Sequence, residues 1–216
     1  LRGLSHMEII AVTQPKPTLK DEHTIITQLF EAGLHILHVR KPDMSTGQLS
    51  RYIEHIPAKY RNRVVIHSHH ELAYKYKLKG MHLTEKHRDS GFWFWFKINF
   101  YRRLRPDLTL TTSYHHLKEL KRWDSRYKYV FISPVFDSLT KENHKPHFTI
   151  RHLEETLQKS KFDVIGLGGI DESKIEICRK IGLKGVALLG VLWEAPDPVE
   201  TFLNIKKLCK GNTDEY

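Results

Sequence analysis

The stretch DVIGLGGIDESKIEICRKIGLKGVALLG, residues 163–190, places strand-like and helix-like segments between glycine turns. An apolar run at 164–167 ends in two glycines, and a helical segment at about 172–181 follows with Asp171 placed to cap it. A second apolar run at 186–189 then ends at another glycine. This order predicts a β–α–β unit whose two strands are parallel.

The glycines after these two strands, Gly168, Gly169 and Gly190, predict a phosphate-binding cup. Without side chains, the backbone N–H groups can approach phosphate oxygens closely, and a helix N-terminus adds a favourable dipole. In an eight-stranded β/α barrel the loops after strands 7 and 8 commonly form such a cup. The alternative is an ordinary β–α–β unit with glycines only at its turns. The position of both glycine sites at carboxyl ends of strands favours the phosphate cup.

The rest of the chain repeats the same rhythm of a short apolar run followed by a helix-length segment. Strict alternation of this kind predicts a parallel sheet, and eight units in 216 residues favour an α/β fold with a single (β/α)8 TIM barrel. A helix is expected at about 115–124, and residues 84–105 form the least regular region. The expected strands are 8–13, 35–40, 63–67, 80–83, 108–112, 128–132, 164–167 and 186–189.

Composition limits the classes of partner. The net charge of +10 comes from basic residues that are scattered over the polar faces of expected helices. This pattern favours a solvated surface or an anionic small-molecule substrate over a nucleic-acid or membrane partner. The apolar runs fall well short of the ~20 residues that span a membrane.

The ends of the chain and its two cysteines suggest a cytoplasmic protein. We interpret Met7 as the native start, residues 1–6 as a cloning remnant, residues 7–210 as one barrel domain and residues 211–216 as a flexible tail. No signal peptide is visible ahead of the first strand. Cys178 and Cys209 lie in helical patterns without metal-ligand spacing, so we expect reduced, buried thiols.

The carboxyl ends of the strands are where a barrel places its chemistry. His115, just after the fifth strand, is the best catalytic candidate because histidine exchanges protons near neutral pH. It could equally be an exposed histidine at a helix start, and Ser113 could be only a helix cap. The strand ends offer few carboxylates, which suits anion binding and proton transfer better than Mg²⁺.

Three further features have both a functional and a plain interpretation. Ser138, Thr140 and Lys141 form either an anion-clamping loop or a solvated polar loop. The histidines at 67, 69 and 70 resemble metal ligands in composition only, because alternate positions at a strand–helix junction do not all converge. The aromatic run at 92–96 is typical of core or of an oligomer interface.

Taken in order, several segments of this chain resemble the thiamin phosphate synthase and TenI family. The resemblance implies a (β/α)8 barrel and one of two activities. Synthases join hydroxymethylpyrimidine diphosphate to thiazole phosphate and release pyrophosphate, whereas TenI-type members isomerise a thiazole carboxylate phosphate to its aromatic tautomer. The matching segments are AGLHILHVRK (32–41), VVIHSHHELA (64–73), GMHLTEKH (80–87), TTSYHHLKEL (111–120), YVFISPVFDSLTK (129–141), VIGLGGIDESKI (164–175) and GVALLGVL (185–192).

The departures from the synthase pattern lie in the first half of the chain. The family has Gln-x-Arg-x-Lys after its second strand; here His38 replaces the glutamine, Arg40 is kept, and the lysine is lost or shifted to Lys41. The acidic residues that hold Mg²⁺ in the family correspond to Ser68 and His87. His67 stands where the family has asparagine, so together with Ser68 and His87 it is a degenerate metal-site position.

The resemblance also implies roles for the residues that match. The glycine cup would hold the thiazole phosphate, and His115 with Ser113 would match the Ser-x-His motif of TenI-type tautomerases. Arg40, His38 and the loop of Ser138, Thr140 and Lys141 would bind substrate or diphosphate.

Three hypotheses follow. We favour a metal-independent TenI-like thiazole tautomerase with His115 as acid and base. The alternatives are a divergent thiamine-phosphate synthase, which would need Mg²⁺, and an inactive barrel that only binds thiazole or thiamin phosphate. A homo-oligomer through residues 92–96 is a further expectation.

Overall fold

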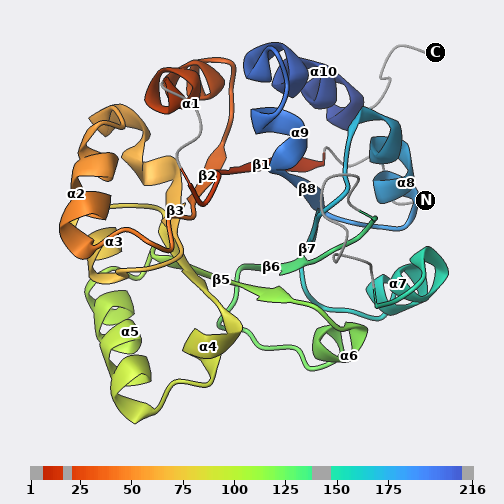
Figure 1. Cartoon of the computed structure of the whole chain (residues 1–216). Coiled ribbons are helices and arrows are strands. Elements are labelled where there is room, and N and C mark those ends of the chain that lie inside the picture. The colour runs from red at the N-terminus through yellow and green to blue at the C-terminus, as the bar shows by residue number, and fades with distance from the viewer. Residues whose placement is uncertain (1–6, 17–20, 138–146, 211–216) are drawn as a thin grey trace.

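The computed structural model describes residues 7–16, 21–137 and 147–210 and shows a closed barrel of eight parallel strands surrounded by helices (Figure 1). Each strand pairs in parallel with its neighbours in the chain, and the last pairs with the first. This confirms the predicted single (β/α)8 TIM barrel. The strands are β1 (Glu8–Val12), β2 (Ile36–Val39), β3 (Val64–Ile66), β4 (Gly80–Leu83), β5 (Thr109–Tyr114), β6 (Tyr129–Ile132), β7 (Val164–Leu167) and β8 (Gly185–Leu188).

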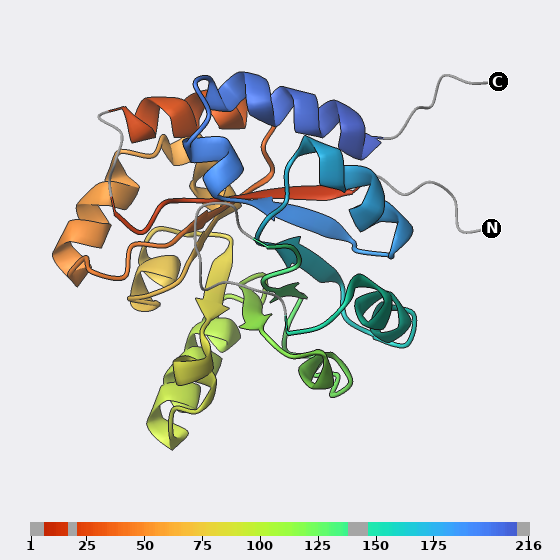
Figure 2. The same cartoon turned by 45° about the vertical axis from the view of Figure 1, so that its right-hand side comes forward.

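The helices form the outer layer, in which α1 and α10 lie side by side over the outside of the barrel (Figure 2). Two short 3₁₀ segments, Ala58–Arg63 and Glu172–Lys174, complete this layer, and the second runs directly into α8 within the helix expected at about 172–181. The helices are α1 (Glu22–Glu31), α2 (Thr46–Glu54), α3 (Glu71–Lys75), α4 (Glu85–Arg88), α5 (Phe92–Leu104), α6 (Leu117–Leu120), α7 (Ile150–Leu157), α8 (Ile175–Lys180), α9 (Gly190–Trp193) and α10 (Pro198–Lys210).

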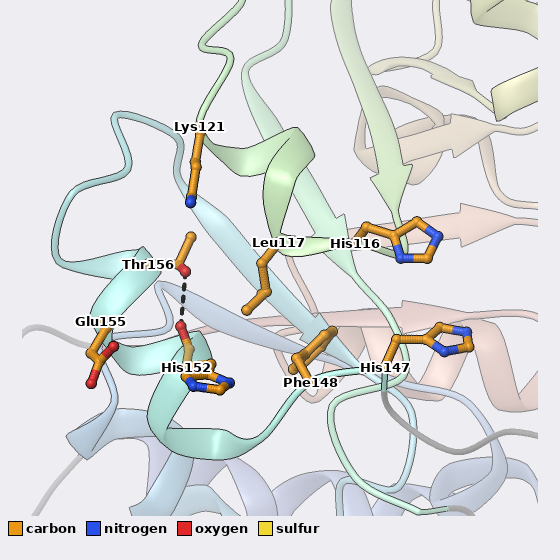
Figure 3. Close-up of a pocket in the computed structure, with 8 residues that line it drawn as sticks. All are labelled: His116, Leu117, Lys121, His147, Phe148, His152, Glu155 and Thr156. Atoms are coloured by element: carbon orange, nitrogen blue, oxygen red, sulfur yellow. Dashed lines mark hydrogen bonds between the residues drawn. The ribbon is translucent and has the colours of Figure 1, made fainter.

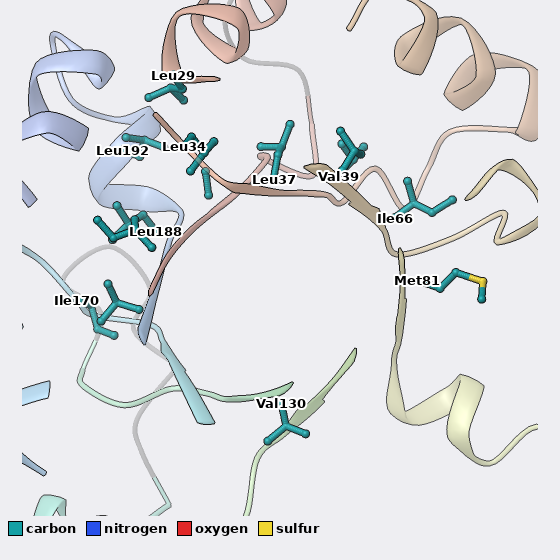
Figure 4. Close-up of a cluster of buried hydrophobic side chains, with 14 of the residues drawn as sticks. Leu29, Leu34, Leu37, Val39, Ile66, Met81, Val130, Ile170, Leu188 and Leu192 are labelled. Carbon is teal, nitrogen blue, oxygen red and sulfur yellow. The ribbon is translucent and has the colours of Figure 1, made fainter. Parts of the chain in front are cut away.

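Alternation along the strands separates two hydrophobic layers. Successive strand residues point to opposite faces, so Leu37, Val39 and Met81 point outward and pack beneath the helices (Figure 4). The residues between them point into the barrel, which we call the lumen. The apolar side chains that fill the lumen are Ile10, Val12, Ile36, Val65, Tyr129, Phe131, Ile165 and Ala187.

The region that the sequence marked as least regular, 84–105, is mostly helical, so that prediction was wrong. It holds α4 and the 13-residue helix α5. Phe94, Trp95, Ile98 and Tyr101 recur at helical spacing and pack toward the core. The continuous aromatic run hid this spacing, because aromatic residues also occupy the outer face of the same helix.

That outer face of α5 is apolar and exposed. Phe92 and Trp93 are 72% and 78% exposed, and Phe96 and Phe100 are about half exposed. Oligomerisation through this face stays a prediction. Across the described residues, the helices include none with the length and apolar character needed to cross a membrane.

The predicted bounds of the helix at about 115–124 were also wrong. β5 continues to Tyr114, and α6 begins only at Leu117, with His116 as its N-cap. Ser113 therefore lies inside a strand and is not a helix cap. His115 lies in the short turn between strand and helix, at the carboxyl end of the barrel.

Candidate active site

Three histidines project into the lumen from neighbouring strands. His38 lies in β2 and His82 in β4, and both are buried, while His67 directly follows β3 and is half-buried. Because Leu37 and Met81 point outward, the alternation of each strand turns His38 and His82 inward. Sequence reasoning missed His82, although the same alternation was available to find it.

Hydrogen bonds tie these imidazoles to one another and to lumen hydroxyls. His38 Nδ1 lies 2.9 Å from His67 Nε2, and His38 Nε2 lies 2.7 Å from the Tyr129 hydroxyl. His82 bonds to Thr111 Oγ1 at 2.8 Å and to Ser113 Oγ at 2.9 Å. Burial lowers the pKa of His38 to about 3 and holds the pKa values of His67 and His82 well below the ordinary range. All three rings are therefore neutral at pH 7.

Two of the predicted site residues make hydrogen bonds inside the lumen. His38, which the resemblance implies would bind substrate or diphosphate, has both ring nitrogens engaged there. Ser113, which the resemblance pairs with His115 in a Ser-x-His motif, bonds through its hydroxyl to His82. Both side chains point into the barrel from within their strands, and their roles toward a substrate stay predictions.

Arg40 and Lys41 follow β2 but differ completely in their surroundings. Arg40 is exposed and directly follows β2, at the carboxyl end of the barrel where the lumen opens. Lys41 is 1% exposed, and its Nζ contacts both carboxylate oxygens of Glu22 at 2.8 Å. If the family lysine is shifted to Lys41, it is therefore committed to a buried ion pair.

His115 lies at the rim of the barrel with a fixed ring orientation. Its Nδ1–H donates to the carbonyl oxygen of Ser133 at 2.8 Å. In the neutral ring this bond assigns the proton to Nδ1 and leaves the lone pair on Nε2. The ring can therefore accept a proton at one defined atom.

An ion pair that sequence reasoning missed holds the turn beneath His115. One carboxylate oxygen of Glu119 accepts from the backbone N–H groups of His115 and His116 at 3.0 and 3.1 Å. The other accepts from Arg88 at 3.1 Å, and Arg88 also donates to Thr112 and to the Ser113 carbonyl at 2.7 Å. This network connects α4, β5 and α6, and no sequence motif marks it.

The glycine cup forms at the ends of β7 and β8. Gly168 and Gly169 have left-handed φ angles of +94° and +65°. A Cβ on Gly169 would lie 2.6 Å from the carbonyl oxygens of Phe136 and Asp137, so only glycine fits there. Across the described residues, no hydrogen bond uses the N–H groups of Gly168 and Gly169, so both stay available to an anion.

Replacing Gly169 with alanine tests the cup. The clash and the positive φ predict a loss of about 1–3 kcal/mol in unfolding free energy. They also predict about 10- to 100-fold weaker binding of a phosphorylated thiazole, the equivalent of one lost charged hydrogen bond. Gly91→Ala is the matched control, because a Cβ there meets nothing within 4 Å. Calorimetric affinities that are equal in the two variants would contradict the cup.

The positions that correspond to the family's Mg²⁺ ligands do not fit that ion. Ser68 carries no carboxylate, and His87 packs against Phe94 while its Nδ1 bonds to Thr84. Mg²⁺ is held through carboxylate oxygens, and Ser68 and His87 supply none. Ser138, Thr140 and Lys141 lie outside the described residues.

A separate cavity of about 300 Å³ lies between α6 and α7, outside the barrel (Figure 3). Its histidines His116 and His147 lie side by side, with ring centroids 5.2 Å apart. The predicted site residues do not line it, so it adds nothing to the site at the barrel mouth. The lining residues are His116, Leu117, Lys121, His147, Phe148, His152, Glu155 and Thr156.

Buried histidines make the stability depend on pH. His70 is 6% exposed and donates to the His82 carbonyl at 3.2 Å, and burial lowers its pKa from 6.5 to about 4. Below about pH 6.5 the unfolded chain binds this proton and the folded chain does not, so stability falls as pH drops toward 4. We expect His70 alone to cost about 2 kcal/mol of unfolding free energy between about pH 7 and about pH 5.

Urea unfolding at the two pH values measures this effect. His70→Gln keeps a donor for the carbonyl but removes the titration, so its unfolding free energy should depend less on pH. His35→Gln, at an exposed position, is the control. Equal pH dependence in the His70 variant and the wild type would show that this histidine does not carry the effect.

Comparison with known proteins identifies the family. The family model described as "Thiamine monophosphate synthase" matches residues 9–192. The chain belongs to this family. It is similar to the thiamine phosphate pyrophosphorylase structure from Bacteroides thetaiotaomicron, with 31% identity, a TM-score of 0.74 and coverage of 94% of this chain and 97% of the other.

Curated members of the thiamine monophosphate synthase family align along most of their length. "Putative thiamine-phosphate synthase 2" of Aquifex aeolicus is 23% identical over 190 residues, which are 86% of this chain and 97% of the relative. The thiamine-phosphate synthase of Vibrio parahaemolyticus is 25% identical over 195 residues, 87% and 89% of the two chains. These matches support an enzyme of thiamine biosynthesis.

Proposed function

We propose that this member of the family is a TenI-type thiazole tautomerase. It would convert a thiazole carboxylate phosphate to its aromatic tautomer by moving a proton. One observation carries the proposal: Ser133 connects the base to the cup. Its carbonyl accepts the His115 Nδ1–H, and its Oγ lies 3.6 Å from the position of a Cβ on Gly168.

The reaction then follows from the orientation of His115. The free N–H groups of Gly168 and Gly169 hold the phosphate, which leaves the ring of the substrate toward the barrel mouth. His115 Nε2 removes a proton from one position and returns it to another, as a general base and then a general acid. The resulting imidazolium keeps its Nδ1–H bond to Ser133 throughout.

Arg40 suits the carboxylate of this substrate. A guanidinium binds a carboxylate through two parallel hydrogen bonds. Arg40 is exposed at the lumen entrance and makes no ion pair with the residues that the structure describes. A positive side chain in this position supports a carboxylated substrate.

Thiamine-phosphate synthase activity is the second candidate, and the relatives favour it. Those compared above carry the names thiamine-phosphate synthase or thiamine phosphate pyrophosphorylase. Against it stand Ser68 and His87 in place of acidic residues, and Lys41 in its buried pair with Glu22. A diphosphate leaving group depends heavily on neutralisation by a metal ion.

Parallel assays of the wild-type protein separate the candidates. One follows aromatisation of the thiazole carboxylate phosphate, and the other follows pyrophosphate release from the two synthase substrates with and without Mg²⁺. We expect turnover only in the first. Turnover only in the second would assign the synthase reaction, and binding without turnover in both would assign a binding-only barrel.

A further inference from the structure

The lumen histidines form a group with the chemistry of a metal site. One ring nitrogen from each of His38, His67 and His82 can be chosen so that all three atoms lie within 4.8 Å of one another. The three residues come from neighbouring strands, so the barrel backbone fixes their spacing. We propose that these residues bind one divalent transition metal ion of the zinc class.

Hydroxyl groups around the lumen hydrogen-bond to two of the rings, as the groups that support metal-bound histidines do. The Tyr129 hydroxyl bonds to His38 Nε2 and leaves Nδ1 directed at His67. Thr111 Oγ1 bonds to His82 Nδ1, so His82 Nε2 is the atom that would bind the ion, in exchange for its hydrogen bond to Ser113 Oγ. Metal-bound histidines characteristically use their second nitrogen in this way, which fixes both ring orientation and tautomer.

The donor set selects the kind of ion. Neutral imidazole is a ligand for Zn²⁺, Co²⁺, Ni²⁺ and Cu²⁺, whereas Mg²⁺ prefers carboxylate oxygens. Catalytic zinc is commonly held by three histidines, and the fourth coordination position is left for water or another oxygen. The burial that lowers the pKa values of these rings also keeps them neutral and ready to bind.

Binding requires one ring to turn. The His67 and His82 rings are stacked, with centroids 4.1 Å apart and planes 17° apart. The lone pair of an imidazole nitrogen lies in the ring plane, so two nearly parallel rings cannot direct their lone pairs at one ion. His67 is the ring that can turn, because it is half-buried and bonds to no hydroxyl in the described part of the chain.

The rival arrangement is a hydrogen-bonded imidazole cluster without an ion. The histidines His116, His147 and His152 line the surface cavity between α6 and α7, but within the described residues their ligand atoms do not converge as those of the lumen histidines do. The proposal does not depend on the proposed tautomerase activity, because the base His115 and the glycine cup are separate from the lumen ligands.

Titration of the chelator-treated 216-residue protein with Co²⁺ and Zn²⁺ tests the proposal. We expect one equivalent to bind, with the visible absorption bands of four-coordinate Co²⁺ and displacement by Zn²⁺. His38→Gln and His82→Gln should each weaken binding at least about 100-fold, and Tyr129→Phe about 10- to 100-fold. His116→Gln, which alters only the surface histidines, should bind as the wild type does.

Three results would overturn the proposal. They are no stoichiometric binding by the wild type, wild-type affinity in His38→Gln and His82→Gln, and loss of binding in His116→Gln. If the lumen variants fail to fold, X-ray absorption of the zinc-loaded wild type and of zinc-loaded His116→Gln decides instead. Three imidazole ligands in both proteins support the lumen site, and fewer than three in either protein contradict it.

Discussion

Replacing His115 with alanine should slow aromatisation of the thiazole carboxylate phosphate by about 10²- to 10⁴-fold, the usual contribution of a positioned acid–base group. The substitution removes the Nε2 lone pair but leaves the phosphate cup and Arg40 untouched. Substrate affinity should therefore change little while kcat falls. Steady-state kinetics of the purified variant, followed by the absorbance of the aromatic product, measure both quantities.

His116→Ala is the matched control for this variant. His116 is the neighbouring residue, is also exposed, and stacks on His147. It should retain the wild-type rate. Equal rates in wild type and His115→Ala would remove His115 from the chemistry, and equal losses in both variants would point to a general disturbance of the turn.

Replacing Lys41 with methionine should lower the free energy of unfolding by about 3–5 kcal/mol. The Lys41 side chain is fully buried against Glu22, whose carboxylate is 8% exposed. Removing the lysine leaves that carboxylate in the protein interior without a counter-charge. Most of the expected loss of stability comes from burying the unpaired Glu22 carboxylate. The lost attraction between Lys41 and Glu22 contributes less.

A double variant separates these two contributions. Lys41→Met combined with Glu22→Leu removes both charges, and most of the lost stability should return. Lys97→Met is the surface control: its pair with Glu71 is substantially exposed, and its loss should cost about 1 kcal/mol or less. Chemical denaturation of all four proteins checks the series. A Lys41 variant as stable as the Lys97 variant would contradict the buried-pair assignment.

The barrel was predictable from sequence because most strands are short apolar runs that end at a clear break, although β5 (TLTTSY) is more polar. The glycine turn after β7 was predictable for the same reason, since Gly168 and Gly169 directly follow an apolar run. Phosphate binding at this turn stays a prediction. His82 was missed because attention to strand ends overlooked the inward face of β4. The alternation of Met81 outward and His82 inward carries that information.

Other features depend on contacts between distant residues. Lys41 directly follows Arg40, yet Lys41 is buried and Arg40 is exposed. The difference arises because the Lys41 side chain points to the buried side, where it pairs with Glu22 of α1. The pairing of Arg88 with Glu119 joins residues 31 positions apart. Neither the burial of Lys41 nor the pairing of Arg88 with Glu119 can be predicted from local propensity or residue spacing.

The most direct test of the proposed reaction is the initial rate of aromatisation by the wild-type protein, measured against buffer and against His115→Ala with the same substrate. We predict a clear acceleration by the wild type that His115→Ala loses. The contradicting result is a wild-type rate equal to buffer, together with pyrophosphate release when hydroxymethylpyrimidine diphosphate and thiazole phosphate are supplied instead.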